Sequence, residues 1–266
     1  VFPFILGTYP HILSDRMSLI WVKELSGPRL FNLKSPAFNN ITLPILYSVK
    51  SFTSVDDVER TTCGILTTPN TRYYMTADVS NYEDSVCFSL DQINQTLDCQ
   101  GHTISMDVYS NPTAIYMGYE SGKVMNCKID GVGRGIIIGS GTSDIMSNMN
   151  ITNNTFYYLG DTADCIAGRG IEKLTKSNMI DSEISYNTFN YLNGDNGAGD
   201  RCGDESFAIN LNNSNNNVII GNKIFKTNGN PTYGIKLTGS NNIIKDNSIS
   251  GTYYGGLVMD SHQNSS

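Results

Sequence analysis

Short apolar segments recur along this chain, and each of them ends at an asparagine or a cysteine that is followed by another apolar residue. One example runs from Ile151 to Phe156 and reads Ile-Thr-Asn-Asn-Thr-Phe. The marked residues are Cys99, Cys127, Asn154, Asn187, Asn222 and Asn247. They follow one another at steps of 28, 27, 33, 35 and 25 residues. A recurring period in this range predicts stacked supersecondary units that bury a continuous core together.

Each unit also contains a second apolar segment, in which a small residue precedes isoleucine or leucine. Gly234-Ile235-Lys236-Leu237 shows the pattern, with Ile235 and Leu237 alternating around Lys236. This period of two predicts a strand with one side toward a core and the other toward water. No long segment of period 3.6 separates the strands, which argues against alternating strands and helices. A β-sandwich would not repeat the same two-strand signature in phase.

The stretch from Asn94 to Ile104 reads Asn-Gln-Thr-Leu-Asp-Cys-Gln-Gly-His-Thr-Ile. It resembles the opening N-x-T-L-D-C-x-G-x-T-I of right-handed parallel β-helix proteins in the pectin-lyase-like superfamily, in particular exported archaeal and bacterial surface proteins. The resemblance covers residues 60–261. It implies an all-β fold, a right-handed parallel β-helix (solenoid) preceded by a non-repeat N-terminal segment. It implies no single activity, because the superfamily holds lyases, hydrolases, epimerases, adhesins and scaffolds.

Residues 1–59 lie outside the repeat, and residues 60–266 are assigned to the β-helix. The first segment contains the only tryptophan and scattered prolines. Solenoid ends need covering, so this segment is expected to be a cap on the first coil. The alternative is an arm that completes the strand edge of a neighbouring subunit. The candidate interface residues are Phe2, Phe4, Ile5, Leu6 and Trp21.

Composition fits a folded protein with many tight corners. The 266 residues include 30 asparagines and 25 glycines, both of which tolerate left-handed backbone. The net charge is −7 and no cluster of Lys and Arg occurs, so nucleic acid is not expected as a partner. No apolar run reaches the roughly 18–20 residues that span a bilayer. The chain starts at Val1 without a methionine, as expected of a processed chain or part of a longer one.

Six cysteines are spaced at about one coil. Cys63 and Cys87 are 24 residues apart, and Cys165 and Cys202 are 37 apart. Adjacent coils are about 4.8 Å apart, which suits a disulfide, so both pairs are predicted to be bridged. Reduced, buried cysteines remain the alternative. Cys99 and Cys127 share one position in successive coils and are predicted to form a bridge or a pair of inward thiols.

Sequons for N-glycosylation give weak support for export, because so many asparagines produce them by chance. They begin at Asn40, Asn94, Asn150, Asn153, Asn212 and Asn264. Together with the cysteine pattern they favour an extracellular or cell-surface location.

One loop is a candidate site for calcium. The glycine-rich stretch from Asn193 to Glu205 carries four carboxylates, which are the kind of ligand that Ca²⁺ prefers. They are Asp195, Asp200, Asp204 and Glu205. A solvated acidic loop is the alternative. Three histidines and no Cys-x-x-Cys motif disfavour zinc and copper, so no other cofactor is expected.

Catalytic motifs of β-helix hydrolases are not found. The resemblance implies Asn-x-Asp, Asp-Asp, Gly-His-Gly and Arg-x-Lys on successive coils, but His102 is followed by threonine and the pair Asp56-Asp57 precedes the first expected coil. Arg134, Arg169 and Arg201 are isolated along the sequence and are expected to be surface charges. No catalytic residue is therefore predicted.

The sequence favours a non-catalytic extracellular structural protein, a subunit of a cell-surface filament, sheath or adhesin that self-associates into a homopolymer. Two alternatives involve polysaccharide. One is a carbohydrate-binding β-helix module that uses its tyrosine pairs as stacking surfaces. The other is a Ca²⁺-dependent polysaccharide lyase. The tyrosine pairs are Tyr73-Tyr74, Tyr157-Tyr158 and Tyr253-Tyr254.

Overall fold

The chain forms two compact units, Val1–Thr53 and Ser54–Ser266. A computed structural model describes residues 31–35, 38–43, 57–81, 85–106, 111–139, 145–160, 167–193, 205–228, 232–252 and 255–260. In the first unit, β1 (Phe31–Ser35) pairs antiparallel with β2 (Phe38–Leu43). All other strands belong to the second unit, and the described ranges contain no helix.

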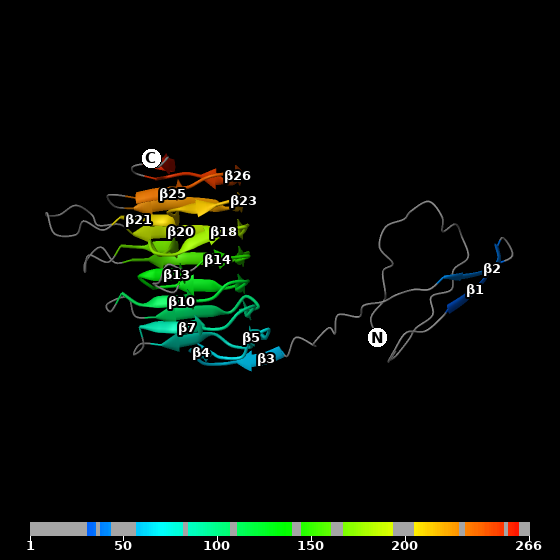
Figure 1. Cartoon of the computed structure of the whole chain (residues 1–266). Coiled ribbons are helices and arrows are strands. Elements are labelled where there is room, and N and C mark those ends of the chain that lie inside the picture. Colours follow the sequence, from blue (N-terminus) through cyan, green and yellow to red (C-terminus); the bar gives the residue numbers. More distant parts are fainter. Residues whose placement is uncertain are drawn as a thin grey trace, which may run out of the picture. The chain divides into compact units, whose positions relative to one another are not determined.

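Three parallel sheets run along the second unit, and successive coils of the chain stack in sequence order (Figure 1). Sheet 1 consists of β4 (Gly64–Leu66), β7 (Val86–Leu90), β10 (Thr113–Met117), β13 (Arg134–Ile138), β17 (Arg169–Lys173), β21 (Ser206–Leu211), β25 (Thr232–Thr238) and β28 (Gly255–Asp260). Sheet 2 consists of β3 (Asp57–Arg60), β5 (Arg72–Met75), β8 (Thr96–Asp98), β11 (Lys123–Met125), β15 (Asn150–Thr152), β19 (Glu183–Ser185), β23 (Val218–Ile220) and β26 (Ile243–Lys245).

Sheet 3 consists of β6 (Val79–Asn81), β9 (Thr103–Met106), β12 (Lys128–Asp130), β16 (Thr155–Leu159), β20 (Thr188–Asn193), β24 (Lys223–Asn228) and β27 (Ser248–Ile249). A shorter sheet 4 consists of β14 (Ile145–Ser147), β18 (Asn178–Ile180) and β22 (Ser214–Asn215). Each complete coil therefore visits sheets 1, 2 and 3 in turn, which gives an all-β parallel β-helix.

Two details differ from the sequence prediction. The repeat was expected to contain two strands per unit, but the asparagine or cysteine that marks each unit is a corner between a sheet 2 strand and a sheet 3 strand. The third strand was missed because segments such as β12 are only three residues long. The first coil also begins at Asp57, and Asp57 pairs with Arg72 within sheet 2 rather than preceding the β-helix.

The core consists of rows of apolar side chains that repeat from coil to coil. Sheet 1 aligns Ile115, Ile136, Ile171, Ile209 and Ile235, each fully buried. Sheets 2 and 3 contribute equivalent rows that pass through Ile151 and Ile129. Because a buried isoleucine stabilises a fold by roughly 1.5–3 kcal/mol relative to an exposed one, the rows hold the stacked coils together.

Small residues before the sheet 1 isoleucines make room for sheet 3. Phe156 and Phe189 stack with ring centroids 4.5 Å apart in the core. A Cβ atom at Gly135 would lie 2.6 Å from the Phe156 ring, and one at Gly170 would lie 2.5 Å from the Phe189 ring. The small-then-isoleucine pattern of the sequence thus reflects close packing between two sheets.

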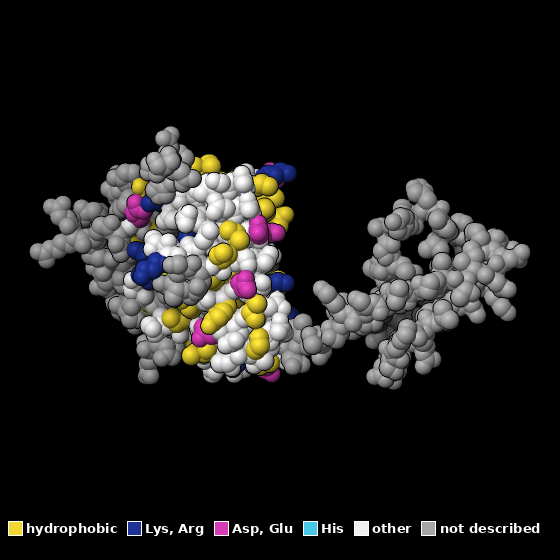
Figure 2. All heavy atoms as spheres, viewed as in Figure 1, with side chains coloured by type: hydrophobic (Ala, Val, Ile, Leu, Met, Phe, Trp, Pro, Cys, Tyr) yellow, Lys and Arg dark blue, Asp and Glu magenta, His cyan; other side chains and the backbone are white. Residues whose placement is uncertain are grey.

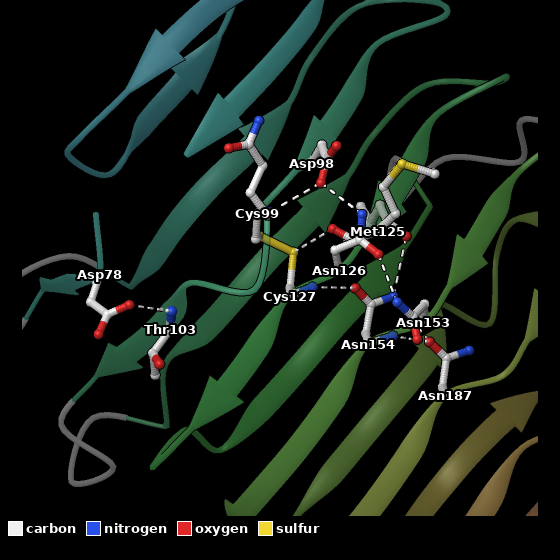
Figure 3. Close-up of a disulfide and its surroundings, with 12 residues drawn as sticks. Asp78, Asp98, Cys99, Thr103, Met125, Asn126, Cys127, Asn153, Asn154 and Asn187 are labelled. Carbon is white, nitrogen blue, oxygen red and sulfur yellow. Dashed lines mark hydrogen bonds between the residues drawn. A yellow bond between two sulfur atoms is a disulfide. The ribbon is translucent and has the colours of Figure 1, made fainter. Parts of the chain in front are cut away.

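The corner between sheets 2 and 3 is held by a ladder of buried amides (Figure 3). The Asn187 Oδ1 atom accepts hydrogen bonds from the backbone N–H and from Nδ2 of Asn154, both at 3.0 Å. The Asn187 Nδ2 atom donates to the Ile151 carbonyl and to Asn222 Oδ1. Asn222 and Asn247 repeat this arrangement one coil further on. These bonds satisfy backbone groups that the corner would otherwise leave buried and unpaired.

A second ladder lies at the corner that precedes sheet 2. The Ser182 hydroxyl accepts from the N–H of Met149, and Asn217 Oδ1 accepts from the N–H of Ser182. Asn242 Oδ1 then accepts from the N–H of Asn217. The residue before each ladder position has positive φ, as at Asn153 and Asn216. Asparagine tolerates this conformation, which accounts for its abundance in the chain.

Lys173 interrupts an otherwise aliphatic core row. Its neighbour across sheet 1 is Ile138, and it is only 1% exposed. Its Nζ donates to the Ser177 carbonyl. Burial lowers the pKa of Lys173 to about 8. A lysine at this position therefore carries a desolvation cost that its aliphatic neighbours do not.

Replacing Lys173 with methionine is expected to raise the free energy of unfolding by about 2 kcal/mol at neutral pH. There the ammonium is charged in both states, and folding removes it from water. Between pH 8 and 10.5 the folded chain releases this proton before the unfolded chain does, so wild-type stability rises with pH. The advantage of K173M should therefore shrink across this range, as measured by urea unfolding at several pH values.

Lys176→Met is the matched control, because Lys176 is exposed on the same turn. Its stability should stay within about 0.5 kcal/mol of wild type throughout the pH range. A difference between K173M and wild type that does not depend on pH would contradict the assignment of the cost to the buried charge.

Candidate functional site

Polar and aromatic side chains gather on the outer face of sheet 1. Arg134 of β13 and Arg169 of β17 occupy paired positions on adjacent strands. A second row of paired positions runs through Glu172, Asn210 and Lys236. Parallel in-register stacking thus joins residues that are far apart along the chain into one surface, which we call the sheet 1 face.

Both described carboxylates at the centre of this face are held by cations. Glu172 accepts two hydrogen bonds from Arg169 Nη1, at 3.2 and 3.3 Å, and neither side chain is more than 16% exposed. Glu205 is ion-paired with Lys236. The Arg169 guanidinium also lies over the Phe207 ring, 5.8 Å from its centroid. These partners hold both carboxylates in fixed positions.

Arg134 is different from the other cations of the face. Its Nε is buried and has no hydrogen-bond partner. It lies one strand away from Arg169, so two like charges are neighbours, while Glu172 bonds to Arg169. The Asn210 Oδ1 atom is also buried and without a partner. The face therefore contains one buried donor and one buried acceptor whose hydrogen-bonding capacity is unused.

This pairing of arginines is not evident from the sequence, in which Arg134 and Arg169 are isolated. The structure corrects the expectation of isolated charges, because both residues begin sheet 1 strands in the same register. One feature of the sequence indicates that the two arginines are equivalent, because the tripeptide Arg-Gly-Ile begins at both Arg134 and Arg169. Arg201 lies outside the described residues.

The cysteines form two bridges in the described part of the chain. Cys63 is bonded to Cys87, with a Cα–Cα distance of 4.6 Å, and Cys99 is bonded to Cys127, with a Cα–Cα distance of 4.7 Å. Of the two options for Cys99 and Cys127, the structure therefore has the bridge. Cys165 and Cys202 lie outside the described residues. Each bridge joins consecutive coils, and the second occupies the first two positions of the buried amide row (Figure 3).

The proposed calcium ligands are not brought together by any described contact. Glu205 is paired with Lys236. Asp195, Asp200 and Asp204 lie outside the described residues. Within the ranges that the structure describes, no group of three or more His, Cys, Asp or Glu side chains could hold a metal ion.

The sequons differ in exposure. Asn94 and Asn153 are exposed, and their Nδ2 atoms donate to Asn70 and Asn126. Asn150 and Asn212 are half-buried. Asn40 lies in β2, and Asn264 is outside the described residues. Among the sequons whose exposure the structure describes, those at 94 and 153 are thus the exposed ones.

Other predicted residues are placed as follows. His102 Nδ1 lies 3.2 Å from Asp78 Oδ1 at a corner, as expected of a structural residue. Tyr73 is buried in the core, whereas Tyr158 is exposed. Tyr253 and Tyr254 and all the interface candidates at positions 2, 4, 5, 6 and 21 lie outside the described residues. Among the described residues there is no helix that could span a bilayer.

Comparison with protein families gives one match. A family model described as "Right handed beta helix region" matches residues 113–266, more than half of the chain. The chain belongs to this right-handed β-helix family. The match agrees with the parallel sheets of the structure and gives the hand of the coil. No curated protein and no solved structure matches the chain. Family membership establishes architecture and leaves the function to be argued from the residues.

Proposed function

We propose that this protein is a non-catalytic, extracellular structural protein, a β-helix subunit of a cell-surface filament, sheath or adhesin. The observation that carries the proposal is the continuous line of cross-links along the sheet 2 to sheet 3 corner. It begins with the Cys99–Cys127 disulfide and continues through the buried amides of Asn154, Asn187 and Asn222. Such a line resists separation of the coils along the axis, as a structural rod requires.

The charged side chains support the same proposal. Arg72 bridges three coils by bonding to Asp57 at 3.1 Å and to Asp98 at 2.8 Å. Burial alone would raise the pKa of Asp98, but hydrogen bonds from Arg72 and Asn126 outweigh it and lower the pKa. Together with the Arg169–Glu172 pair, these contacts use charge to hold the fold rather than to prepare a reactive group. Two disulfides further favour an oxidising compartment.

Electron microscopy of native material, taken from culture without dissociation, tests the proposal. Filaments or sheets whose axial repeat matches a stack of coils, and which are labelled by an antibody against this chain, are the expected result. The full chain purified in oxidising buffer should also associate as its concentration rises. A chain that remains a single monomeric rod both on cells and at high concentration would overturn the structural role.

The sheet 1 face supports a second candidate function, the binding of an anionic polysaccharide. The specific observation is the buried Arg134 Nε without a partner, beside Arg169 and on the same face as the unpaired Asn210 Oδ1. A uronic acid residue offers both a carboxylate and hydroxyl groups to such a surface. A Ca²⁺-dependent lyase would use the same ligand but would also cleave it.

Polygalacturonate binding by the wild type and by R134A distinguishes these functions. If the face binds uronates, R134A should weaken binding at least tenfold, whereas K123A, which removes an exposed charge from sheet 2, should change it less than twofold. Release of unsaturated uronides in the presence of Ca²⁺ would establish a lyase. Absence of binding by the wild type would exclude the second candidate.

A further inference from the structure

Three tyrosines adopt a backbone conformation that tyrosine rarely takes. Tyr158, Tyr186 and Tyr191 have φ angles of 47°, 56° and 59°. The other non-glycine residues with positive φ in the described ranges are Asn, Asp, Gln or Ser. The left-handed region costs a residue such as tyrosine about 1 kcal/mol or more, and such strain is concentrated at functional sites. We therefore expect the tyrosine side chains at these positions to have a function that offsets the backbone strain.

Two of these tyrosines form one platform. Tyr158 and Tyr191 stack with ring centroids 5.1 Å apart and an angle of 17° between the ring planes. On either side of them, Tyr157 pairs with Asn190 and Leu159 pairs with Leu192, so Tyr158 and Tyr191 occupy equivalent positions on adjacent strands. With its left-handed backbone, Tyr158 is 54% exposed on the outside of sheet 3, whereas the next residue, Leu159, is buried.

The coil before the platform has a glycine at the equivalent position. Asp130 pairs with Tyr157, and the next residue, Gly131, has a φ of 65° and stands where the following coils have Tyr158 and Tyr191. Glycine provides no side chain to cover the ring of Tyr158. Burial raises the pKa of the neighbouring Asp130. Asp130 and Asn190 are both half-buried in one row of outward positions, so polar groups flank the aromatic platform.

We propose that the stacked rings of Tyr158 and Tyr191 bind the apolar face of a pyranose ring in a neutral glycan, with Asp130 and Asn190 bonding to its hydroxyl groups. An aromatic ring face attracts the weakly positive C–H groups of a sugar. The face of the β-helix shown in Figure 2 consists mostly of uncharged polar side chains and backbone, with hydrophobic and charged side chains scattered among them.

The site is separate from the sheet 1 face and does not depend on the structural role proposed above. Titration calorimetry of the full chain with cellohexaose, xylohexaose and chitohexaose tests it. At least one hexaose should bind, and Y158A and Y191A should each lose at least tenfold in affinity. Y158F should bind like wild type. Y119A is the matched control, because Tyr119 is 52% exposed and lies outside the platform.

Tyr158→Asn separates binding from folding. Asparagine accepts positive φ better than tyrosine, so Y158N should unfold at the same or a higher denaturant concentration than wild type while it loses binding. Failure of all three hexaoses to bind the wild type would overturn the proposal, as would unchanged affinity in Y158A and Y191A. Self-association of the wild type that Y158A abolishes, without any glycan binding, would assign the platform to a second copy of the chain and overturn it as well.

Discussion

Replacing Asn187 with alanine is expected to lower the free energy of unfolding by about 3–5 kcal/mol. The side chain is fully buried and makes four hydrogen bonds within the ladder. Its removal leaves the N–H of Asn154 and the carbonyl of Ile151 buried without their side-chain partner. Each such group costs about 1–3 kcal/mol, which is much more than an average hydrogen bond contributes. Chemical denaturation followed by circular dichroism measures the loss.

Two further variants separate the causes. Asn187→Leu keeps the branched shape and leaves no cavity but cannot hydrogen bond, so a loss of stability similar to that of N187A would assign the effect to the amide rather than to a cavity. Asn216→Gly is the matched control at an exposed asparagine with a φ of 57°. It should change stability by less than about 0.5 kcal/mol. A loss below about 1 kcal/mol in both N187A and N187L would show that the ladder contributes little.

Removing the Cys99–Cys127 bridge by a double change to alanine should cost about 3–4 kcal/mol. The bridge closes a loop with a sequence separation of 28 residues, and Cys63–Cys87 closes one of 24. Loop entropy alone predicts nearly equal losses for the two bridges. Cys99 and Cys127 are both buried, however, whereas Cys63 is half-buried, so C99A/C127A also loses packing in the core.

C99A/C127A is therefore expected to be less stable than C63A/C87A by roughly 1 kcal/mol, as compared by urea unfolding under identical conditions. Far-ultraviolet circular dichroism of both variants before denaturation would show that the coils are retained. Equal losses would mean that only the chain constraint matters, and a larger loss in C63A/C87A would contradict a packing contribution from Cys99 and Cys127.

The repeat was readable from the sequence because its corner residues carry a physical requirement. Asn154, Asn187 and Asn222 recur because a buried corner needs a side chain that both donates and accepts. The rows of buried isoleucine were likewise predictable, because the apolar residues alternate along the sequence. The third strand of each coil was not predictable, because three residues are too few to show a period of two.

The candidate surfaces were much harder to predict. Coil length varies between 25 and 35 residues, so the sequence does not say which residues of adjacent coils are aligned. Arg134 and Arg169 became neighbours only when the register of β13 and β17 was known. The stacking of Tyr158 on Tyr191 depends in addition on a left-handed backbone at both residues that no pattern of apolar residues predicts.

The hydrogen bonds of the buried amide ladder can form only in a fixed order during synthesis of the chain. The Oδ1 atom of each rung accepts from the backbone of the coil before it, as Asn187 does from Asn154 and Asn222 does from Asn187. A ribosome delivers the coils in this same order. The corner of each newly made coil therefore keeps an unpaired N–H until the next coil has been synthesised and has docked. In nascent chains, the corner amides of each coil should accordingly become protected against hydrogen exchange only after the following coil has been synthesised.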